Sequence, residues 1–373
     1  MIRLLISRNM KQALYFFAAL IVASCSTGNK KPMETPKDLL VHQLFTFAEE
    51  GKIAYGHQDD LCYGHAWRVE DWEADELERS DVKDVTGKYP MVLGFDLGDI
   101  EHGADKNLDG VPFDLIRKAA LKHIERGGIV TFSWHPDNIL TGGDAWDVSS
   151  NQVVKSVLMG GDNHAEFMIW LHRAADFLES LGDVAVIFRP WHEHTGSWFW
   201  WGKDLCTPQE YIELFRMTWV YFTKERGLTN LVWCISPNAP ITPEEYMERY
   251  PGDEFVDIMG ADYYEFLNPA HLGEMGAVFS AVIRDLLNTL TALGTEHHKL
   301  IALSETGLEG IPDPVWWTEV LYPSIKDYSI SYVLTWRNAW DQPGHFFGAW
   351  EGFENAADFK AFCEKDEILL LDI

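Results

Sequence analysis

The stretch VAVIFRPWHE, residues 184–193, decides the fold. Its first five residues form a continuous apolar run, which is typical of a strand buried on both faces in a parallel sheet. Arg189, His192 and Glu193 follow this run directly. A buried strand that ends in charged and aromatic side chains predicts an α/β protein whose chemistry lies at the carboxyl ends of its strands.

The same pattern recurs along the chain. Seven further runs rich in β-branched and apolar residues are KIAYGHQ (52–58), MVLGFDL (91–97), GIVTFSWH (128–135), NLVWCIS (230–236), VDIMGADYY (256–264), LIALSETG (300–307) and SYVLTWRN (331–338). Stretches with helical spacing separate most of them, at 114–128, 164–182, 207–227 and 242–250. Eight buried strands alternating with helices predict a (β/α)8 TIM barrel. A doubly wound open sheet is the alternative, but its usual glycine-rich first turn does not occur in the sequence.

The chain begins with a segment that is typical of an export signal. Basic residues within 1–12 precede a short apolar run at 13–24, and VAS then precedes Cys25. This pattern resembles a bacterial lipoprotein signal, in which the cysteine is lipidated and becomes the new N-terminus. We expect a lipoprotein signal peptide at 1–24, a tether at 25–37, one catalytic domain at 38–365 and a C-terminal tail at 366–373.

The expected location follows from this leader. A lipid on Cys25 would hold the protein at the outer membrane of a Gram-negative bacterium. The residues after Cys25 lack an acidic cluster, which favours the periplasmic face over the cell surface. An ordinary secretory signal cut nearby is the alternative.

The charge of the chain excludes one class of partner. The formal net charge is −28 at pH 7, which repels nucleic acid but tolerates a neutral substrate. Besides Cys25 there are four cysteines, without the close spacing of a metal site, and their disulfide state stays open: Cys62, Cys206, Cys234 and Cys363. We expect a monomer without cofactor or metal.

Polar, charged or aromatic residues end all eight predicted strands, and in a barrel these ends meet at one mouth. Glu193 and Glu305 stand out because each directly follows an apolar strand. The fourth and seventh strands lie on opposite sides of an eight-stranded ring, so the two carboxylates can face each other. Two carboxylates about 5–5.5 Å apart suit a retaining glycoside hydrolase.

The tryptophans indicate the kind of substrate. The chain has 16 tryptophans, four of them within 188–202. A sugar ring offers an apolar face on which indoles stack and a polar rim that Arg, His and Asn can hydrogen-bond. Indoles next to Glu193 would also raise its pKa by desolvation, as an acid catalyst requires. A nucleophile must stay ionised, and we expect Arg189 and Tyr264 to stabilise Glu305.

At this point the chain resembles glycoside hydrolase family 26, over roughly residues 38–365. The motifs that carry the resemblance are YGHQDD, SWHPDN, RPWHEHTGSWFWWG, GADYY, LSETG and TWRNA. The family consists mainly of β-1,4-mannanases with a (β/α)8 barrel and a retaining mechanism. The resemblance implies that Glu193 is the acid/base and Glu305 the nucleophile. It implies substrate-binding roles for His135, Arg189, His192, Trp198, Tyr264, Trp336, Arg337 and Asn338.

The expected activity is therefore cleavage of β-1,4-mannosidic linkages in mannan, glucomannan or galactomannan, by double displacement. Whether cleavage is internal or releases mannobiose from a chain end stays open. Mixed-linkage β-glucan and β-1,3-xylan are alternative substrates. A non-catalytic glycan-binding lipoprotein is a second alternative, although it would need neither glutamate.

A metal enzyme is the remaining rival, because histidines follow several of the strands. The sequence has no H-E-x-x-H motif, which disfavours it. DKNLDG (105–110) is faintly similar to a calcium loop, but a plain turn explains it better.

Overall fold

The computed structural model describes residues 34–72, 77–265 and 275–372. Twelve strands are described: β1 Ile53–Gln58, β2 Tyr63–Gly64, β3 Trp67–Arg68, β4 Tyr89–Pro90, β5 Val92–Asp96, β6 Ile129–Ser133, β7 Val186–Arg189, β8 Leu231–Ile235, β9 Ile258–Glu265, β10 Leu300–Leu308, β11 Tyr332–Thr335 and β12 Ile368–Leu371. The helices are α1 Pro36–Glu49, α2 Asp81–Thr86, α3 Phe113–Glu125, α4 Val153–Val157, α5 His164–Glu179, α6 Pro208–Val220, α7 Pro243–Glu248, α8 Met275–His297, α9 Tyr322–Ile325 and α10 Ala356–Cys363. Short helical turns are η1 Glu70–Trp72, η2 Ile100–His102, η3 Tyr221–Glu225 and η5 Trp316–Leu321.

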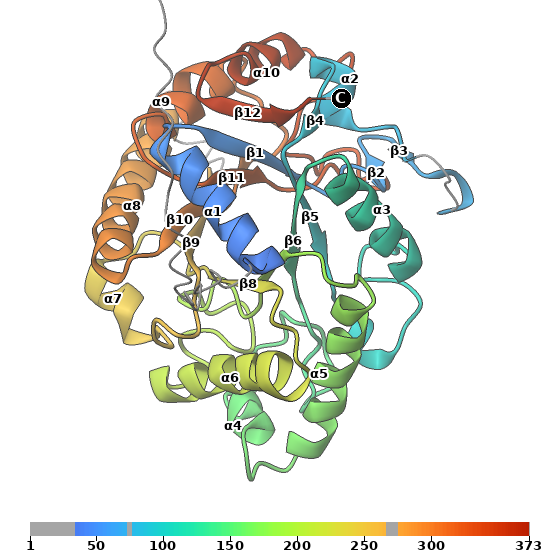
Figure 1. Ribbon diagram of the computed structural model, residues 1–373, viewed down its shortest axis with the longest axis vertical. Helices are drawn as coiled ribbons and strands as arrows, with labels where there is room; N and C mark the ends of the chain where they lie inside the picture. The colour runs from blue at the N-terminus through green and yellow to red at the C-terminus, as the bar shows by residue number, and fades with distance from the viewer. Residues whose placement is uncertain (1–33, 73–76, 266–274, 373) are drawn as a thin grey trace, which may run out of the picture. The chain divides into compact units, whose positions relative to one another are not determined.

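Eight of these strands form a closed parallel barrel. They follow one another in the order β1-β5-β6-β7-β8-β9-β10-β11, and β11 pairs with β1 to close the ring (Figure 1). Every residue of β1, β5, β6, β7, β8 and β10 is buried, as expected for strands covered on both faces. The predicted barrel is confirmed, and each of its strands falls on one of the eight predicted runs.

The helices between the strands follow the predicted pattern. Helix α6 begins at Pro208 behind the cap Thr207, whose hydroxyl accepts from the Glu210 backbone while the Glu210 carboxylate accepts from the Thr207 backbone. Helix α8 is long and apolar enough to cross a membrane by composition, but it packs on β9 and β10 as a barrel helix. Its buried residues recur at helical spacing, at Phe279, Ile283 and Leu290.

Helix α1 closes the amino-terminal end of the barrel. Leu40 and Leu44 pack with Ile129, Ile258 and Leu300, which are the first residues of their strands. Figure 1 shows α1 lying across the barrel. The helix begins at Pro36, two residues before the boundary expected from the sequence. This plug leaves the opposite end, where the strands finish, for a site.

The last residues of the chain also join the sheet. Strand β12 pairs in parallel with β1 and antiparallel with β4. The segment that the sequence sets apart as a tail is therefore packed on the outside of the barrel over Ile368–Leu371. The four cysteines named above are all free.

Candidate active site

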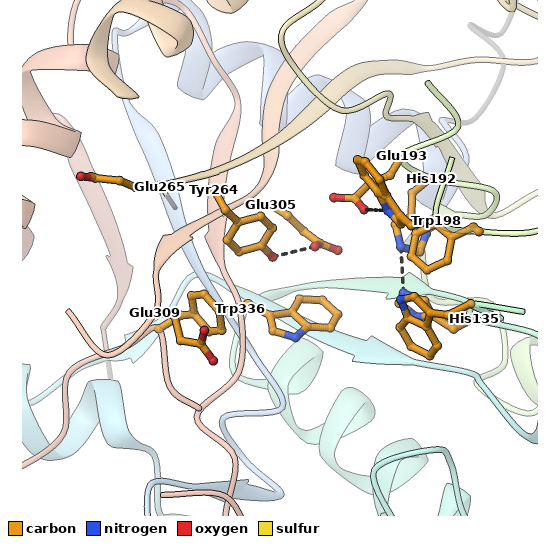
Figure 2. A pocket seen from close by; sticks show the side chains of 12 residues that line it. His135, His192, Glu193, Trp198, Tyr264, Glu265, Glu305, Glu309 and Trp336 are labelled. Atoms are coloured by element: carbon orange, nitrogen blue, oxygen red, sulfur yellow. Dashed lines mark hydrogen bonds between the residues drawn. The ribbon is translucent and has the colours of Figure 1, made fainter. Parts of the chain in front are cut away.

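A cavity of about 300 Å³ opens at the carboxyl ends of the barrel strands. Residues at or just after the ends of β6, β7, β9, β10 and β11 supply most of its wall (Figure 2). The lining residues are His135, Trp146, His192, Glu193, Trp198, Phe199, Tyr264, Glu265, Glu305, Glu309, Trp336 and Phe347. Seven of the predicted site residues are among them.

Glu305 lies in β10 and is almost fully buried, with 4% of its surface exposed. Arg189 Nη2 donates to its Oε1, and the Tyr264 hydroxyl donates to its Oε2 at 2.7 Å. These are the two donors that the sequence predicts. Burial acts to lower the pKa of Arg189, but Asp262 and Glu305 outweigh it and raise that pKa, so the guanidinium keeps its charge. Both oxygens of Glu305 are thus bonded to donors that favour a carboxylate.

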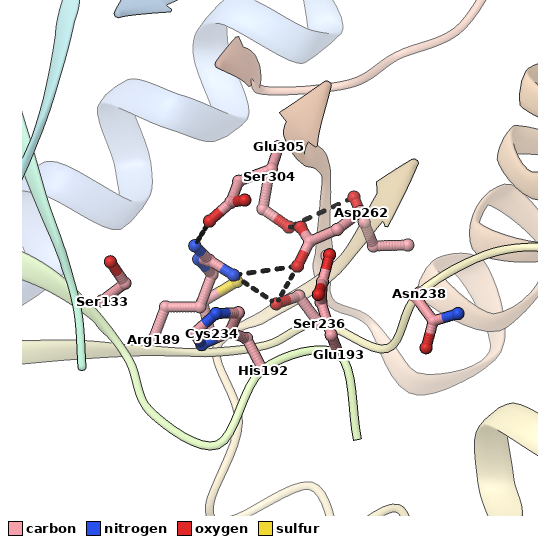
Figure 3. A network of polar contacts seen from close by, with 12 residues as sticks. Ser133, Arg189, His192, Glu193, Cys234, Ser236, Asn238, Asp262, Ser304 and Glu305 are labelled. Carbon is pink, nitrogen blue, oxygen red and sulfur yellow. Dashed lines mark hydrogen bonds and ion pairs between the residues drawn. The ribbon is translucent and has the colours of Figure 1, made fainter. Parts of the chain in front are cut away.

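Asp262 lies beside Glu305 and shares its arginine. Arg189 Nη1 donates to Asp262 Oδ2 at 2.9 Å, and the hydroxyls of Ser236 and Ser304 donate to the same carboxylate (Figure 3). Burial raises the pKa of Asp262 to about 7, with the charge on Glu305 adding to the effect. The sequence places Asp262 at a strand end but does not single it out as a site residue.

Glu193 follows β7 in an uncommon backbone conformation. Its φ is 52°, in the left-handed region, and its N–H donates to the Ser236 carbonyl at 2.6 Å. Trp198 Nε1 donates to Glu193 Oε2 at 2.7 Å. Burial, followed by the charges of Asp262 and Glu305, raises the pKa of Glu193 well above its usual range. The strained turn therefore directs the Glu193 side chain into the cavity. Because its pKa is raised, this side chain tends to keep its proton.

The two glutamates face each other across the mouth. Glu193, Asp262 and Glu305 each place one oxygen within 4.8 Å of the others. This upper limit is compatible with the spacing of about 5–5.5 Å between carboxyl groups in retaining glycosidases. Three carboxylates at this distance could also attract a cation, but the Arg189 guanidinium already pairs with two of them.

His135 and His192 form the floor of the cavity between the carboxylates and the aromatic wall. Their Nε2 atoms lie 3.0 Å apart, and His135 Nδ1 lies 2.7 Å from Asp96 Oδ2. Both rings are almost fully buried. Both nitrogens of His135 therefore bond to protein groups, whereas His192 bonds through Nε2 and its buried Nδ1 has no hydrogen-bond partner among the described residues.

The aromatic stretch 188–202 divides between core and cavity. Of its four tryptophans only Trp198 lines the cavity, with 41% of its surface exposed. Trp191, Trp200 and Trp201 are fully buried beneath it. The expectation that a wall of indoles flanks Glu193 is therefore right for one ring, and the others support the turn from below.

Three predicted substrate-binding residues lie outside the cavity lining: Arg189, which bonds Glu305 from beneath it, Arg337 and Asn338. Arg337 pairs with Asp109 at 2.9 Å and donates to Tyr63. Asn338 is buried: its Nδ2 donates to Asp81 Oδ2 at 2.8 Å, and its Oδ1 accepts from two backbone N–H groups. These bonds hold a loop in place, and the substrate-binding role of Asn338 stays a prediction.

Several lining residues escape the sequence analysis. Trp146, Glu265, Glu309 and Phe347 lie outside the quoted motifs, and Phe199 lies within RPWHEHTGSWFWWG, where nothing distinguishes it from the neighbouring aromatic residues. The exposed aromatic character of Trp146, in a loop after a strand that ends in His135, is the only available signal. Cys25, the predicted lipidation site, lies outside the described residues.

A second group of acids and a histidine lies near the mouth. Asp99, Glu101, His102 and Asp137 bring ligand atoms within 4.8 Å of one another. His102 Nε2 bonds Asp137 Oδ2 at 2.9 Å, and Glu101 accepts from Trp134 Nε1 and the Asp137 backbone. The hydrogen bonds of Glu101, His102 and Asp137 join the loops that follow β5 and β6.

A parallel eight-stranded barrel whose mouth holds two facing carboxylates among aromatic rings defines the class of barrel glycoside hydrolases. The model of glycosyl hydrolase family 26 matches residues 40–306. The chain belongs to this family.

Known relatives agree in fold and sequence. A GH26 β-mannanase from Bacteroides ovatus is 44% identical with a TM-score of 0.84, over 90% of this chain and 95% of that one. The catalytic domain of a Bacillus sp. JAMB-750 endo-β-1,4-mannanase is 29% identical with a TM-score of 0.78, over 91% and 93% of the two chains. A mannan endo-1,4-β-mannosidase from Bifidobacterium adolescentis is 30% identical over 86% of this chain. The chain spans 34% of that relative's length.

Proposed function

We propose that the protein is a retaining glycoside hydrolase that cleaves β-1,4-mannosidic linkages in mannan, glucomannan or galactomannan. The observation that carries the proposal is the pair Glu193 and Glu305, which bring oxygens within 4.8 Å of each other in opposite electrostatic surroundings. The substrate class is supported by the relatives, which are named as mannanases.

The surroundings of each glutamate suit one role. Glu305, bonded by Arg189 and Tyr264, is a carboxylate ready to attack the anomeric carbon. Glu193 holds a proton because burial raises its pKa, so it can protonate the glycosidic oxygen as that bond breaks. The first step thus gives a glycosyl ester on Glu305 and a free sugar alcohol.

The second step reverses the roles. Once Glu305 is esterified it has lost its charge, and one cause of the raised pKa of Glu193 disappears. Glu193 can then take a proton from water, whose oxygen attacks the anomeric carbon and releases Glu305. Two inversions at the same carbon give retained configuration.

Variants of the two glutamates test these roles. With an activated aryl mannobioside, Glu305→Ala should lose turnover altogether, because no covalent intermediate can form. Glu193→Ala should keep its first step, accumulate the glycosyl-enzyme and respond to azide by forming a mannosyl azide of retained configuration. Glu309→Ala, a matched loss of a cavity carboxylate, should show no azide-dependent step.

Three outcomes would contradict the proposal. An inverted product from the wild-type protein would overturn the retaining mechanism. Preferential hydrolysis of mixed-linkage β-glucan or β-1,3-xylan over unsubstituted mannan would overturn the substrate class. Binding of mannan without release of reducing ends would indicate a glycan-binding protein instead.

The proposal extends to location. A basic start, a short apolar run and VAS before Cys25 support lipidation of that residue and attachment at the periplasmic face of the outer membrane. We infer a monomeric enzyme that meets oligosaccharides or polysaccharides near that membrane. Fractionation of the native protein into the soluble phase would contradict the anchor.

A further inference from the structure

Asp96 is a buried carboxylate at the end of β5 that does not line the cavity but touches a residue that does. Its Oδ2 accepts from the Ser133 hydroxyl at 2.6 Å and lies 2.7 Å from His135 Nδ1. Its Oδ1 accepts from the Gly98 backbone at 2.7 Å and the His135 backbone at 3.3 Å. The partner atom in each of these four contacts can donate, so the Asp96 carboxylate acts as the acceptor in all of them.

The chain of contacts continues from Asp96 into the cavity. His135 and His192 meet edge to face, with ring centroids 4.4 Å apart and an interplanar angle of 85°. Their Nε2 atoms are 3.0 Å apart, so one of the two carries the proton between them. Figure 2 shows this contact at the edge of the cavity, next to Glu193.

The surrounding charges decide which histidine carries that proton. Burial acts to lower the pKa of His135, but the Asp96 carboxylate outweighs it and raises that pKa. Burial, Arg189 and His135 all lower the pKa of His192 well below its usual range. His135 therefore holds a proton on Nδ1 that faces Asp96, and its raised pKa favours a second proton on Nε2, which His192 Nε2 would accept. In this arrangement His192 carries its own proton on Nδ1, a buried atom without a hydrogen-bond partner among the described residues.

The His135 ring also supports the aromatic wall. It stacks on Trp146 with centroids 5.3 Å apart and an interplanar angle of 14°. Phe199 and Trp336 meet it edge-on, at 5.2 and 6.3 Å. All three rings line the cavity. A rotation of His135 would therefore move the surface against which a sugar lies.

We propose that Asp96 is a positioning residue, whose carboxylate fixes the orientation and proton arrangement of His135 and, through it, of His192. The effect on catalysis rests on the proposed function, whereas the proton arrangement is a property of the resting protein. The charged or titratable groups that face His135 are Asp96 of β5, Arg189 of β7, His192 after β7, Glu305 of β10 and Asp109 before α3.

Nitrogen-15 NMR of the histidine rings tests the arrangement without any substrate. In the wild-type protein, with His135 assigned by comparison with His135→Gln, we expect protons on both ring nitrogens at neutral pH and a low-field Nδ1–H. His192 should show a bare Nε2 and a protonated Nδ1. In Asp96→Asn the low-field proton should disappear and His135 should lose its charge at lower pH. A wild-type His135 without a proton on Nδ1, or neutral throughout about pH 5–8, overturns the proposal.

Kinetics test the consequence for the cavity. Asp96→Asn should reduce kcat/KM on an aryl mannobioside by about tenfold to a hundredfold, the effect of losing one charged hydrogen bond. Asp257→Asn is the matched control, because this aspartate bonds Trp233 N and Lys37 at the opposite end of the barrel. Its kcat/KM and histidine spectrum should not change.

The pH profile separates positioning from simple loss of structure. In Glu193→Ala the acid/base residue no longer contributes to the pH dependence of kcat/KM on the aryl mannobioside. The remaining alkaline limb of that profile should move to lower pH when Asp96→Asn is added, because His135 then loses its charge at lower pH. An unmoved limb together with an unchanged histidine spectrum overturns the proposal. If Asp96→Asn fails to fold, the NMR spectrum of the wild-type protein still tests whether His135 carries a proton on Nδ1. If the wild-type protein hydrolyses none of these substrates, the proposed function is wrong. The NMR spectrum of the histidines still tests the proton arrangement of His135 and His192 in that case.

Discussion

Replacing Tyr264 by phenylalanine removes one oxygen atom from the site and leaves the ring in place. That hydroxyl donates to Glu305 Oε2 at 2.7 Å, and burial followed by the Glu305 charge raises the pKa of Tyr264 well above its usual range. The tyrosine is therefore a neutral donor at every accessible pH. Arg189 still bonds Oε1 in the variant, so Glu305 should keep its orientation.

The magnitude follows from the kind of bond that is lost. A hydrogen bond to a charged group contributes about 1.5–3 kcal/mol, and Glu305 is too buried for bulk water to replace the donor freely. If the bond is strongest as the ester breaks and the carboxylate re-forms, Tyr264→Phe should slow this step by roughly tenfold to 150-fold. The glycosyl-enzyme should then accumulate.

Rapid-quench measurement on an aryl mannobioside gives the two steps separately, with a burst of phenol followed by slow turnover. Tyr263→Phe is the control, because that ring packs on Phe279 of α8, 5.7 Å between centroids, rather than against the cavity. Turnover of Tyr264→Phe within twofold of the wild type, with an unchanged melting temperature, would refute the reasoning. It would mean that the Tyr264 hydroxyl stabilises the ground state and the transition state of this step equally.

Three other outcomes are expected. Trp336→Ala should lower kcat/KM on mannan by about tenfold to a hundredfold, from a lost stacking contact of roughly 1–3 kcal/mol, with little change in melting temperature; an unfolded variant would make Trp336 a core residue instead. Burial lowers the pKa of His123 to about 4, below its unfolded value of about 6.5. Neutral His123 therefore allows the full free energy of unfolding above about pH 6.5. That free energy should fall by on the order of 3 kcal/mol as the pH is lowered to about 4, because the unfolded state takes up the proton first. Urea unfolding of His123→Gln should accordingly depend less on pH over that window, and equal slopes would contradict this. Cys25→Ala should release the protein from the membrane fraction or leave it uncleaved, and unaltered membrane retention would argue against lipidation.

The barrel was predictable because burial leaves a direct mark on sequence. A strand covered on both faces needs an unbroken apolar run. Its last residue lies at the mouth of the barrel whatever conformation the following loop adopts. This is why Glu193, Glu305 and Arg189 could be placed from their runs alone. The contact between Arg189 and Glu305 followed from charge, because a buried carboxylate needs a donor.

The loops were not predictable in the same way. Trp200 and Trp201 have the same composition signal as Trp198, yet they pack into the core, because the path of a loop depends on tertiary contacts that no periodicity records. Asn338 follows a strand like the other candidates, but its side chain turns away to Asp81. Asp96 ends a strand too, and only the structure shows that it acts on the cavity through His135.

The plug formed by α1 has a consequence for how a long polymer can reach the cleft. The described chain enters at the pole of the barrel that α1 closes, whereas the carboxylates lie at the other pole. The first described residues, 34 and 35, therefore lie at the end of the barrel opposite the cleft. A bulky polymer can enter the cleft without meeting the described start of the chain.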